Sequence, residues 1–405
     1  MEVYLVGGAV RDELLQRPVR ERDWVVVGAM PQQMLEKGYR QVGKDFPVFI
    51  HPETGEEYAL ARTERKTGKG YQGFSCYAEP DVTLEDDLKR RDLTINAMAK
   101  DDKGNIIDPY GGQKDLANRL LRHVSAAFVE DPLRVLRVAR FAARYAHLDF
   151  KVADETRSLM QVIAESGELE YLVPERTFAE LQKALGEHRP SEFFNVLRAS
   201  HANEIIFPEI DNLFGVPQRA DYHPEIDTGV HVMMVIDQAA RLQYPMEVRF
   251  AALMHDLGKA ITPEDVLPSH RGHEAAGVPL IEGFCERLKA PKNYKELAVI
   301  AGREHLHCHR IAEASPNHVV KTLERIDAFR RPERFELFLQ VCEADARGRL
   351  GYEEQDYPQT DLFRKYYRAA AEVSTQAIIE DGYSGEKIAT ELHRRRVEAV
   401  KGVNV

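Results

Sequence analysis

Residue periodicity changes once along this chain, and that change constrains the fold more than any other feature. Up to about residue 125, short apolar runs next to glycine, at residues 3–6 and 24–27, read as buried strands among helical patterns. From about Asp131 onward, apolar residues recur at helical spacing and no convincing strand pattern remains. The sequence therefore predicts an α+β protein in which an α/β head precedes a long, all-helical body.

The length of 405 residues exceeds what one hydrophobic core usually supports, so we expect several domains. We predict a head over residues 1–125 and a helical neck over residues 126–220. A further helical domain follows over residues 221–330, and a helical tail over residues 331–405. Prolines and polar residues between positions 216 and 224 favour a linker before the third domain.

The composition indicates the cellular compartment and limits the kinds of binding partner. The N-terminus lacks the regions of a signal peptide, and no run approaches the roughly 20 apolar residues of a membrane span. The four cysteines include no CxxC pair, which suits a reducing compartment. We therefore expect a cytoplasmic protein with no membrane partner. The net charge of −11 disfavours tight, sequence-blind RNA binding, so any RNA must bind on local basic stripes.

Two adjacent glycines mark a turn that suits phosphate binding. Gly7 and Gly8 follow a strand pattern and precede a helical one, so backbone N–H groups can approach a phosphate there. Arg11 would lie in the first helical turn and pair with the same phosphate. A glycine pair at such a turn more often has only a structural role, so a phosphate-binding role needs support from other residues. Residues 66–73 form a second, basic and glycine-rich loop pattern.

Two carboxylates provide that support. Glu21 and Asp23 are two residues apart before an apolar run, so in an extended strand both side chains point the same way. Like charges held together are costly unless a cation lies between them, and Mg²⁺ is the natural partner of carboxylates and substrate phosphates. Two such ions can activate an attacking hydroxyl and stabilise a leaving pyrophosphate. The alternative is a solvated acidic strand end.

The segment from Gly7 to Asp12, together with the acidic pair, resembles the class II branch of the polymerase-β-like nucleotidyltransferases. That branch holds CCA-adding enzymes and bacterial poly(A) polymerases. The resemblance implies nucleotide transfer with Mg²⁺ at Glu21 and Asp23. The family has Asp where this chain has Glu21, so we expect a ligand with altered geometry.

Residues 89–98 resemble the RRDxTxNA segment of the same branch. The resemblance implies that Arg91 contacts the sugar or the phosphates of the nucleotide. Asp92 and Asn96, one helical turn apart, would hold the turn or the ribose. The alternative for a basic dipeptide is a solvated surface.

Residues 130–134 resemble the EDxxR motif of the branch, and its chemistry can be argued directly. Asp131 can accept from the exocyclic amine of cytosine or adenine, and Arg134 can donate to the neighbouring ring acceptor. Together they would select C and A and reject G and U. The alternative is a capped helix with an internal salt bridge.

Four arginines share one face of the helix that follows Asp131. At 100° per residue, Arg134, Arg137, Arg140 and Arg144 fall within about 120° of one another. Arg137 and Arg140 are candidates for the triphosphate, since arginine suits bidentate phosphate contact.

The helical body offers a second candidate centre. His255 and Asp256 follow an apolar run at residues 250–254, with His231 before them and Asp345 after them. The order H…HD…D resembles the HD superfamily of metal-dependent phosphohydrolases, which implies a mixed N/O ligand set for Mg²⁺, Mn²⁺ or Ni²⁺. A bound ion would activate water for attack on a phosphate ester. One or two further histidines can complete the coordination or position a phosphate, among His270, His273, His305, His307 and His309.

The resemblance covers nearly the whole chain and points to bacterial CCA-adding enzymes that carry an HD domain. It implies addition of C, C and A to tRNA 3′ ends from CTP and ATP, with an HD domain acting on 2′,3′-cyclic and 2′-phosphate ends. Poly(A) polymerase is one alternative, but that family carries a long basic extension and no complete HD set. An HD phosphohydrolase with a head weakened at Glu21 is another.

The sequence leaves two alternatives open, one for the C-terminal arginines and one for the oligomeric state. A predicted C-terminal helix carries three arginines at positions 394–396, which either touch the tRNA backbone or face solvent. The chain is either a monomer or a homodimer.

Overall fold

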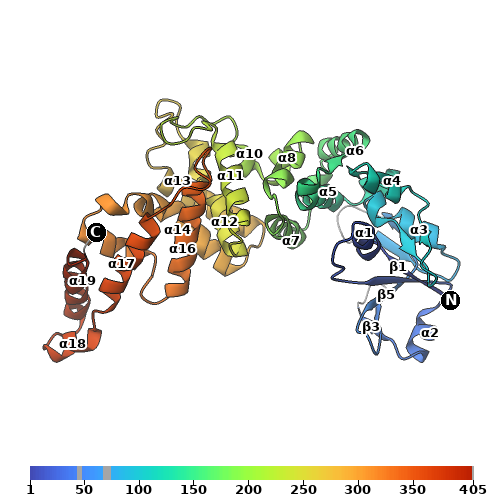
Figure 1. Cartoon of the computed structure of the whole chain (residues 1–405), viewed down its shortest axis with the longest axis horizontal. Helices are drawn as coiled ribbons and strands as arrows, with labels where there is room; N and C mark the ends of the chain where they lie inside the picture. Colours follow the sequence, from blue (N-terminus) through green and yellow to red (C-terminus); the bar gives the residue numbers. More distant parts are fainter. Residues whose placement is uncertain (43–47, 67–73, 404–405) are drawn as a thin grey trace. The chain divides into compact units, whose positions relative to one another are not determined.

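The computed structural model describes residues 1–42, 48–66 and 74–403, so positions 67–73 of the predicted glycine-rich loop lie outside the described residues. The chain forms two compact units. The first comprises Met1–Ala184 and Glu192–Ile206, and the second Leu185–Ser191 and Phe207–Val405. A mixed sheet near the N-terminus precedes a long series of helices, which confirms the predicted α+β class (Figure 1).

A seven-stranded sheet forms the head, with strand order β3-β4-β5-β2-β1-β8-β9. At its centre, β2 pairs antiparallel with β1 and parallel with β5. Neighbouring residues Val25 and Val26 of β2 point to opposite faces and belong to two separate apolar clusters, one on each side of the sheet. The strands are β1 (Glu2–Val6), β2 (Asp23–Val27), β3 (Arg40–Val42), β4 (Val48–Ile50), β5 (Glu57–Leu60), β8 (Ala99–Lys100) and β9 (Ile106–Ile107).

Short helices and a hairpin complete the head. The hairpin pairs β6 (Thr63–Lys66) with β7 (Phe74–Tyr77). The helices are α1 (Gly8–Leu14), α2 (Pro31–Glu36), α3 (Leu84–Lys89), α4 (Gly112–Ala117) and the 3-10 helix η2 (Thr94–Asn96). The first of these directly continues β1, so the turn at Gly7 and Gly8, called the Gly7 turn below, lies at a strand-to-helix junction as predicted.

Helices follow the head in the first unit. They are α5 (Leu133–Tyr145), α6 (Asp154–Glu165), α7 (Pro174–Leu185), α8 (Ser191–Ala199) and α9 (Asn203–Ile206). The expectation of no strands after Asp131 is wrong at one point, because β11 (Lys151–Val152) pairs in parallel with β10 (Leu120–Leu121). Two residues are too few to produce a periodic pattern in sequence.

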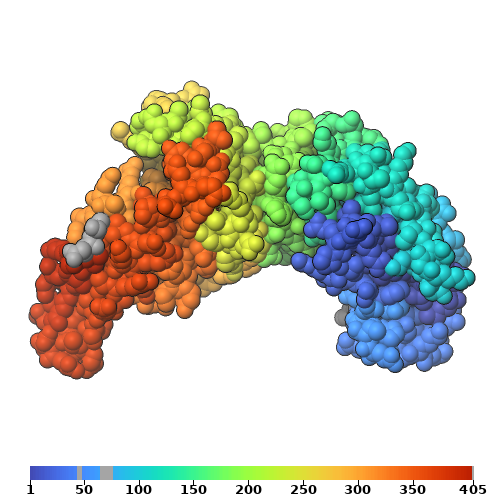
Figure 2. Space-filling view, viewed as in Figure 1, coloured from blue at the N-terminus to red at the C-terminus, as the bar shows by residue number. Residues whose placement is uncertain are grey.

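The second unit is a helical body packed around α12 (Met246–Met254). Residues 250–254 of this helix are fully buried, and α12 contacts α11 (Thr228–Arg241), α14 (Lys292–His309) and α16 (Pro332–Arg347). The space-filling view shows the C-terminal helices at one end of this unit in orange to dark red (Figure 2). The other helices are α10 (Pro208–Asp211), α13 (His273–Arg287), α15 (Pro316–Arg325), α17 (Gln359–Ala371), α18 (Thr375–Glu380) and α19 (Glu386–Lys401).

Within the described residues, we find no helix that is both long and apolar enough to cross a membrane.

Candidate active sites

The Gly7 turn brings distant parts of the head together. Gly7 has φ +69° and donates its N–H to the carbonyl of Met98 at 3.1 Å. The turn therefore favours glycine for its backbone, and a Cβ at this position would lie 2.8 Å from Nη1 of Arg91 and displace the end of that side chain. On the neighbouring strand, Asp23 is in register with Val6, the last residue before the turn. The turn, Arg91 and Asp23 therefore surround one place at the edge of the sheet.

The predicted acidic pair lies beside this turn. Asp23 is the first residue of β2, whereas Glu21 lies two positions before the strand and is exposed. Asp23 keeps contact with solvent, but desolvation by the surrounding protein raises the pKa of its carboxyl. The charge of Arg91 opposes this rise and that of Glu21 adds to it. Because the two carboxylates repel each other electrostatically, the pair fits a divalent cation, and its ligand role stays a prediction.

The segment at residues 89–98 forms a buried polar chain rather than a free basic surface. Asp92 accepts from Nδ2 of Asn96 at 3.0 Å and from Nε of Arg137 at 2.7 Å. Asn96 in turn accepts from Nη1 of Arg11 through its side-chain oxygen. Arg91 is held by Asp87, which accepts from its Nη2 at 3.1 Å. This chain joins α1 to α5 through η2.

Arg11 lies inside the first unit and not on its surface. Its side chain is buried, and its guanidinium lies 5.3 Å from the ring centre of Phe141 and 5.5 Å from that of Tyr145. Nε also donates to Asp12 at 2.9 Å. These contacts make Arg11 a link between α1 and α5, and the phosphate contact stays a prediction.

The base-selecting pair lies at the start of α5. Asp131 precedes Pro132, the N-cap residue of α5, and its side chain accepts from the N–H of Leu133 at 3.1 Å. Arg134 is buried and donates to two backbone carbonyls, those of Ala127 at 2.8 Å and Arg90 at 2.6 Å. The guanidinium is therefore fixed in position before any nucleotide binds, and base selection stays a prediction.

The arginine face of α5 has protein partners that the sequence does not reveal. Arg137 pairs with Asp92, and buried Arg140 donates to Glu180 of α7 at 2.6 Å. Acidic residues outside the helix thus neutralise two members of the predicted basic face. Whether these two arginines also contact a triphosphate stays a prediction.

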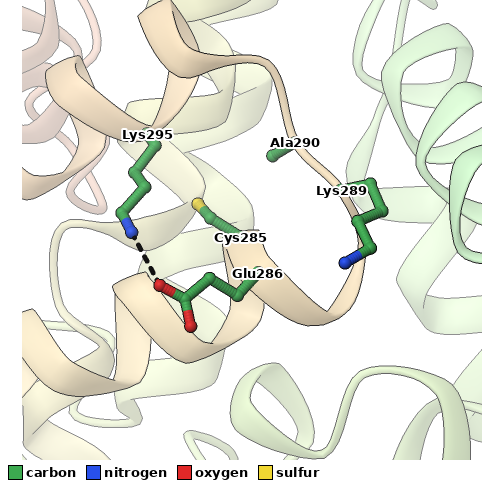
Figure 3. Close-up of a pocket in the computed structure, with 5 residues that line it drawn as sticks. All are labelled: Cys285, Glu286, Lys289, Ala290 and Lys295. Carbon is green, nitrogen blue, oxygen red and sulfur yellow. Dashed lines mark hydrogen bonds and ion pairs between the residues drawn. The ribbon is translucent and has the colours of Figure 1, made fainter.

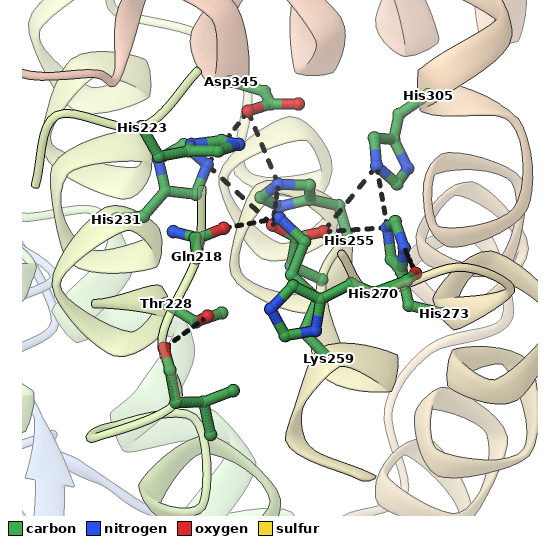
Figure 4. Close-up of polar contacts among 12 residues, drawn as sticks. Gln218, His223, Thr228, His231, His255, Lys259, His270, His273, His305 and Asp345 are labelled. Atoms are coloured by element: carbon green, nitrogen blue, oxygen red, sulfur yellow. Dashed lines mark hydrogen bonds and ion pairs between the residues drawn. The ribbon is translucent and has the colours of Figure 1, made fainter. Parts of the chain in front are cut away.

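Four side chains predicted to bind a metal converge in the second unit, three of which are labelled in Figure 4. We call His231, His255, Asp256 and Asp345 the HD centre. Nε2 of His231 hydrogen-bonds to Oδ1 of Asp345 at 3.0 Å, and Nε2 of His255 lies 3.6 Å from the same oxygen. His255 also approaches Oδ2 of Asp256 at 3.2 Å.

The HD centre is buried and highly charged. Burial opposes charge on Asp345, yet His255 and His309 face this carboxyl and hold its pKa well below the ordinary range. Burial likewise disfavours charge on His255, but the two carboxylates raise its pKa to about 10. Nε2 of His255 and Oδ1 of Asp256 have no hydrogen-bond partner within the described residues. Buried polar atoms of this kind, gathered in one cluster, fit a bound divalent cation.

Three residues around the HD centre were not predicted. Oε1 of Glu225 lies 2.9 Å from Nδ1 of His231, so it can orient that imidazole. Lys259 lies 2.7 Å from Oδ2 of Asp256 and donates to Gln218 at 2.6 Å. Lys259 lies three positions after Asp256, and this spacing was the one feature of the sequence that could have indicated the ion pair. Gln218 comes from the segment at residues 216–224 that the sequence analysis read as a linker, and Glu225 directly follows it.

The other histidines divide into separate groups. His309 hydrogen-bonds to Asp345 at 2.7 Å, and His307 pairs with His318 at 2.9 Å. His270 contacts the carbonyl of Pro217 at 2.9 Å. His273 and His305 lie beside Asp256.

A separate surface pocket lies at the end of α13 and the start of α14 (Figure 3). Its lining includes none of the predicted site residues, and Lys295 is paired with Glu286 at 3.0 Å. The pocket is lined by Cys285, Glu286, Lys289, Ala290 and Lys295.

Three family models match the chain in succession. The "Poly A polymerase head domain" matches residues 3–122, and the "Probable RNA and SrmB- binding site of polymerase A" matches residues 149–214. The "HD domain" matches residues 228–331. Asp345, in α16, lies beyond that last match.

Solved structures share the fold. A Bacillus stearothermophilus CCA-adding enzyme in complex with CTP matches with a TM-score of 0.64 and 22% identity, over 99% of this chain and 89% of that one. A Thermotoga maritima CCA-adding enzyme complexed with tRNA matches with a TM-score of 0.60 and 20% identity, over 100% and 88% of the two chains.

Curated relatives are similar over their full length. The multifunctional CCA protein of Thioalkalivibrio sulfidiphilus is 60% identical over 401 residues, which cover 99% of this chain and 98% of the relative. That of Hahella chejuensis is 59% identical, over 99% and 95%. With its polymerase-type head, its HD domain and this full-length identity, the chain belongs to the family of multifunctional CCA proteins.

Proposed function

We propose that this chain adds C, C and A to tRNA 3′ ends from CTP and ATP, without a nucleic-acid template and with release of pyrophosphate. The observation that carries the proposal is the meeting of the Gly7 turn, Arg91 and Asp23 at one edge of the sheet. The names of the curated relatives, and the solved complexes of similar fold with CTP and with tRNA, support the choice of substrates. Because tRNA is the substrate, we place the enzyme in the cytoplasm.

The head's residues divide the reaction between them. Asp23 and Glu21 would hold Mg²⁺, which supplies activation of the primer hydroxyl and stabilisation of the leaving pyrophosphate. The Gly7 turn and Arg91 orient the triphosphate through N–H donors. Asp131 and Arg134 present an acceptor and a donor to the base edge, in the pattern that C and A match.

Poly(A) addition is the nearest rival, because the head model is shared with poly(A) polymerases. Poly(A) polymerases typically carry a strongly basic C-terminal extension, whereas the arginines of the C-terminal helix here contact other side chains of the protein. Arg394 and Arg395 of α19 both pair with Glu391, and Arg396 stacks over the ring of Phe329. These contacts favour a structural role for the arginine triplet over contact with the RNA backbone.

Incorporation of labelled CTP and ATP, separately and together, into tRNA without its CCA end tests the proposal. Ordered addition of C, C and A followed by a stop is expected, whereas long A tracts would favour poly(A) polymerase. Asp23→Ala should abolish incorporation. Glu21→Asp should change the rate by less than about tenfold, or about 1.4 kcal/mol in barrier. A larger gain would mean that Glu21 has disabled the head and leave only the phosphohydrolase.

We further propose that the HD centre hydrolyses 2′,3′-cyclic and 2′-phosphate ends of RNA with a divalent cation, Ni²⁺, Mg²⁺ or Mn²⁺. The buried imidazoles and carboxylates, with two polar atoms lacking hydrogen-bond partners within the described residues, support this assignment. A cation held there would supply an activated water. We assign this activity to the predicted domain over residues 221–330 together with Asp345 of α16.

The two activities can be separated by substitution. His255→Ala should stop phosphate-ester hydrolysis on an oligonucleotide ending in a 2′,3′-cyclic phosphate, while CCA addition continues. Asp23→Ala should have the reverse effect. Hydrolysis that persists in His255→Ala would refute the assignment.

A further inference from the structure

We propose that Tyr222 and Arg349 bind the terminal nucleotide of the RNA substrate at the opening of the HD centre. Tyr222 stacks on its base and Arg349 pairs with its phosphate. The inference rests on the phosphohydrolase function proposed above and assigns the residues that recognise its substrate. We call Tyr222 and Arg349 the lip; the first belongs to the segment before α11, and the second follows α16.

Solvent reaches the HD centre on the side of Asp345. The side chains of His231 and His255 are fully buried, whereas that of Asp345 is 8% exposed. His309, which hydrogen-bonds to Asp345, is 23% exposed, and His223 is 19% exposed. Figure 4 shows His223, His231 and Asp345 together on one side of His255. A substrate phosphate therefore approaches the centre past His223 and Asp345.

The lip borders this opening and is linked to the HD centre by one carboxylate. Oε1 of Glu225 lies 2.9 Å from Nδ1 of His231, and Oε2 accepts from the N–H of Leu350 at 3.4 Å. Nη1 of Arg349 donates to the carbonyl of Tyr222 at 3.2 Å. The two segments, which are 127 positions apart in the sequence, are therefore held together next to His231.

Arg349 carries a positive charge that the described part of the chain does not neutralise. Its Nε donates to the carbonyl of Ala346 at 2.9 Å, and its guanidinium lies 4.3 Å from the ring centre of Tyr352. These contacts and the one with Tyr222 fix the side chain, but none of them is with a carboxylate. A guanidinium held in this way suits phosphate binding, because its donors match phosphate oxygens in a fixed geometry.

The HD centre needs such a charge when a phosphate binds. Asp256, Asp345 and Glu225 together contribute three negative charges at the centre. Lys259 and one divalent cation balance them when the imidazoles are neutral ligands. A cyclic phosphate then adds one negative charge, and a 2′-phosphate adds about 1.5–2. A charge without a counterion is costly away from bulk water, and Arg349 supplies a cation on the open side.

Tyr222 offers an exposed aromatic ring beside the same opening. It is 57% exposed, and Ile226, four positions later, is 50% exposed. The guanidinium of Arg219 lies 5.1 Å from the ring centre of Tyr222. Tyr222 directly precedes His223, whose ring centre is 4.5 Å from that of His231. One ribose separates a base from a 2′-phosphate, so the base comes within reach of this ring, and bases stack on exposed aromatic side chains.

Steady-state hydrolysis of defined RNA ends by the full-length chain tests Arg349. The substrates are two oligoribonucleotides of one sequence, one ending in a 2′,3′-cyclic phosphate and the other in a 2′-phosphate. Arg349→Gln should raise KM about 30-fold for the 2′-phosphate end and by less for the less charged cyclic end, with kcat and bound Mn²⁺ per chain unchanged. Arg303→Gln makes the same change in charge at an exposed position of α14. This matched control should leave both KM values unchanged.

Removal of the base from the substrate tests Tyr222. With the wild-type chain, a 2′-phosphate end whose last ribose lacks its base should have a KM about tenfold higher than the complete end. Tyr222→Ala should show the same rise with the complete end and no further rise with the abasic end, because both changes remove the same contact. Tyr222→Phe keeps the ring and should behave as the wild type does.

The outcomes separate the lip from the function on which it rests. If the wild type hydrolyses neither end, the phosphohydrolase function and the lip both fail. If it hydrolyses both ends and neither variant changes KM, the lip is refuted and the function stands. Equal rises of KM on both ends in Arg349→Gln, with loss of bound Mn²⁺, would show that Arg349 only links two segments. A base effect that persists in Tyr222→Ala would place the base elsewhere, and either of these last two results would overturn the lip.

Discussion

Arg137 donates from Nε to Oδ2 of Asp92 at 2.7 Å, and this ion pair joins two residues 45 positions apart in the sequence. It connects the segment that carries Arg91 with the helix that carries Arg134. Burial would raise the pKa of Asp92, but the charge of Arg137 and the hydrogen bond from Asn96 hold it well below the ordinary range. The pair therefore stabilises the junction of head and neck as a charged unit.

Asp92→Ala should destabilise the first unit by about 3 kcal/mol, because it leaves Arg137 without its buried partner. This loss of unfolding free energy lies at the lower end of the range for buried ion pairs, because the Arg137 side chain is 36% exposed. Urea unfolding followed by circular dichroism measures the change. Asp102→Ala, at an exposed aspartate of the head, is the control and should have almost no effect. A loss no larger than that of the control would show that the pair does not hold the junction.

The stabilisation from Asp92 should depend on pH in one direction. Its pKa is lowered on folding from an unfolded value of about 3.9, so the contribution is fully present above that value and is lost as pH falls toward the folded pKa. The difference in unfolding free energy between wild type and Asp92→Asn should be constant from pH 7 to about pH 5 and shrink below about pH 4. A difference that grows on acidification would contradict the charged state assigned to Asp92.

Gly7→Ala should reduce nucleotide incorporation about 100-fold, because the new Cβ must displace the Arg91 guanidinium from its position beside the turn. The positive φ alone costs about 1–3 kcal/mol of stability. Gly55→Ala separates the two effects, since Gly55 has φ +72° and a Cβ added there would meet nothing within 4 Å. Both variants should lose stability, but only Gly7→Ala should lose activity. Equal activity in the two would show that the contact with Arg91 has no catalytic role.

Asp131→Ala should relax nucleotide choice by about 10- to 100-fold, the value of one good pair of hydrogen bonds to a base edge. Relative incorporation of UTP and GTP against CTP and ATP measures this change. The hydrogen bond that Asp131 accepts from Leu133 at the start of α5 is lost as well, at about 1 kcal/mol. Asp131→Asn can still accept from the N–H of Leu133 while it changes the pattern shown to the base, so it should alter selectivity with little loss of stability. Unchanged selectivity in both would refute the templating role.

The sequence allowed prediction of features that local spacing determines. The strand containing Val25 and Val26 and the glycine turn follow from such short motifs, whereas the resemblance to the HD superfamily implied that His231, His255 and Asp345 converge. Partners contributed by distant elements could not be predicted. Glu180 neutralises Arg140 from another helix, and only the packing of α13 beside α14 shows that His273 and His305 face one another. The five additional histidines looked equivalent in sequence because periodicity carries no information on which helices meet.

The position of Arg11 has a consequence for how accuracy arises. The same guanidinium that holds Asn96 lies against two aromatic rings of α5, the helix that begins beside Asp131. A displacement of α5 by an ill-fitting base would therefore also shift the turn that we propose to receive the phosphates. Under that coupling, a wrong nucleotide would bind more weakly and would also react more slowly. Its poorly fitting base would move the triphosphate away from the position needed for attack.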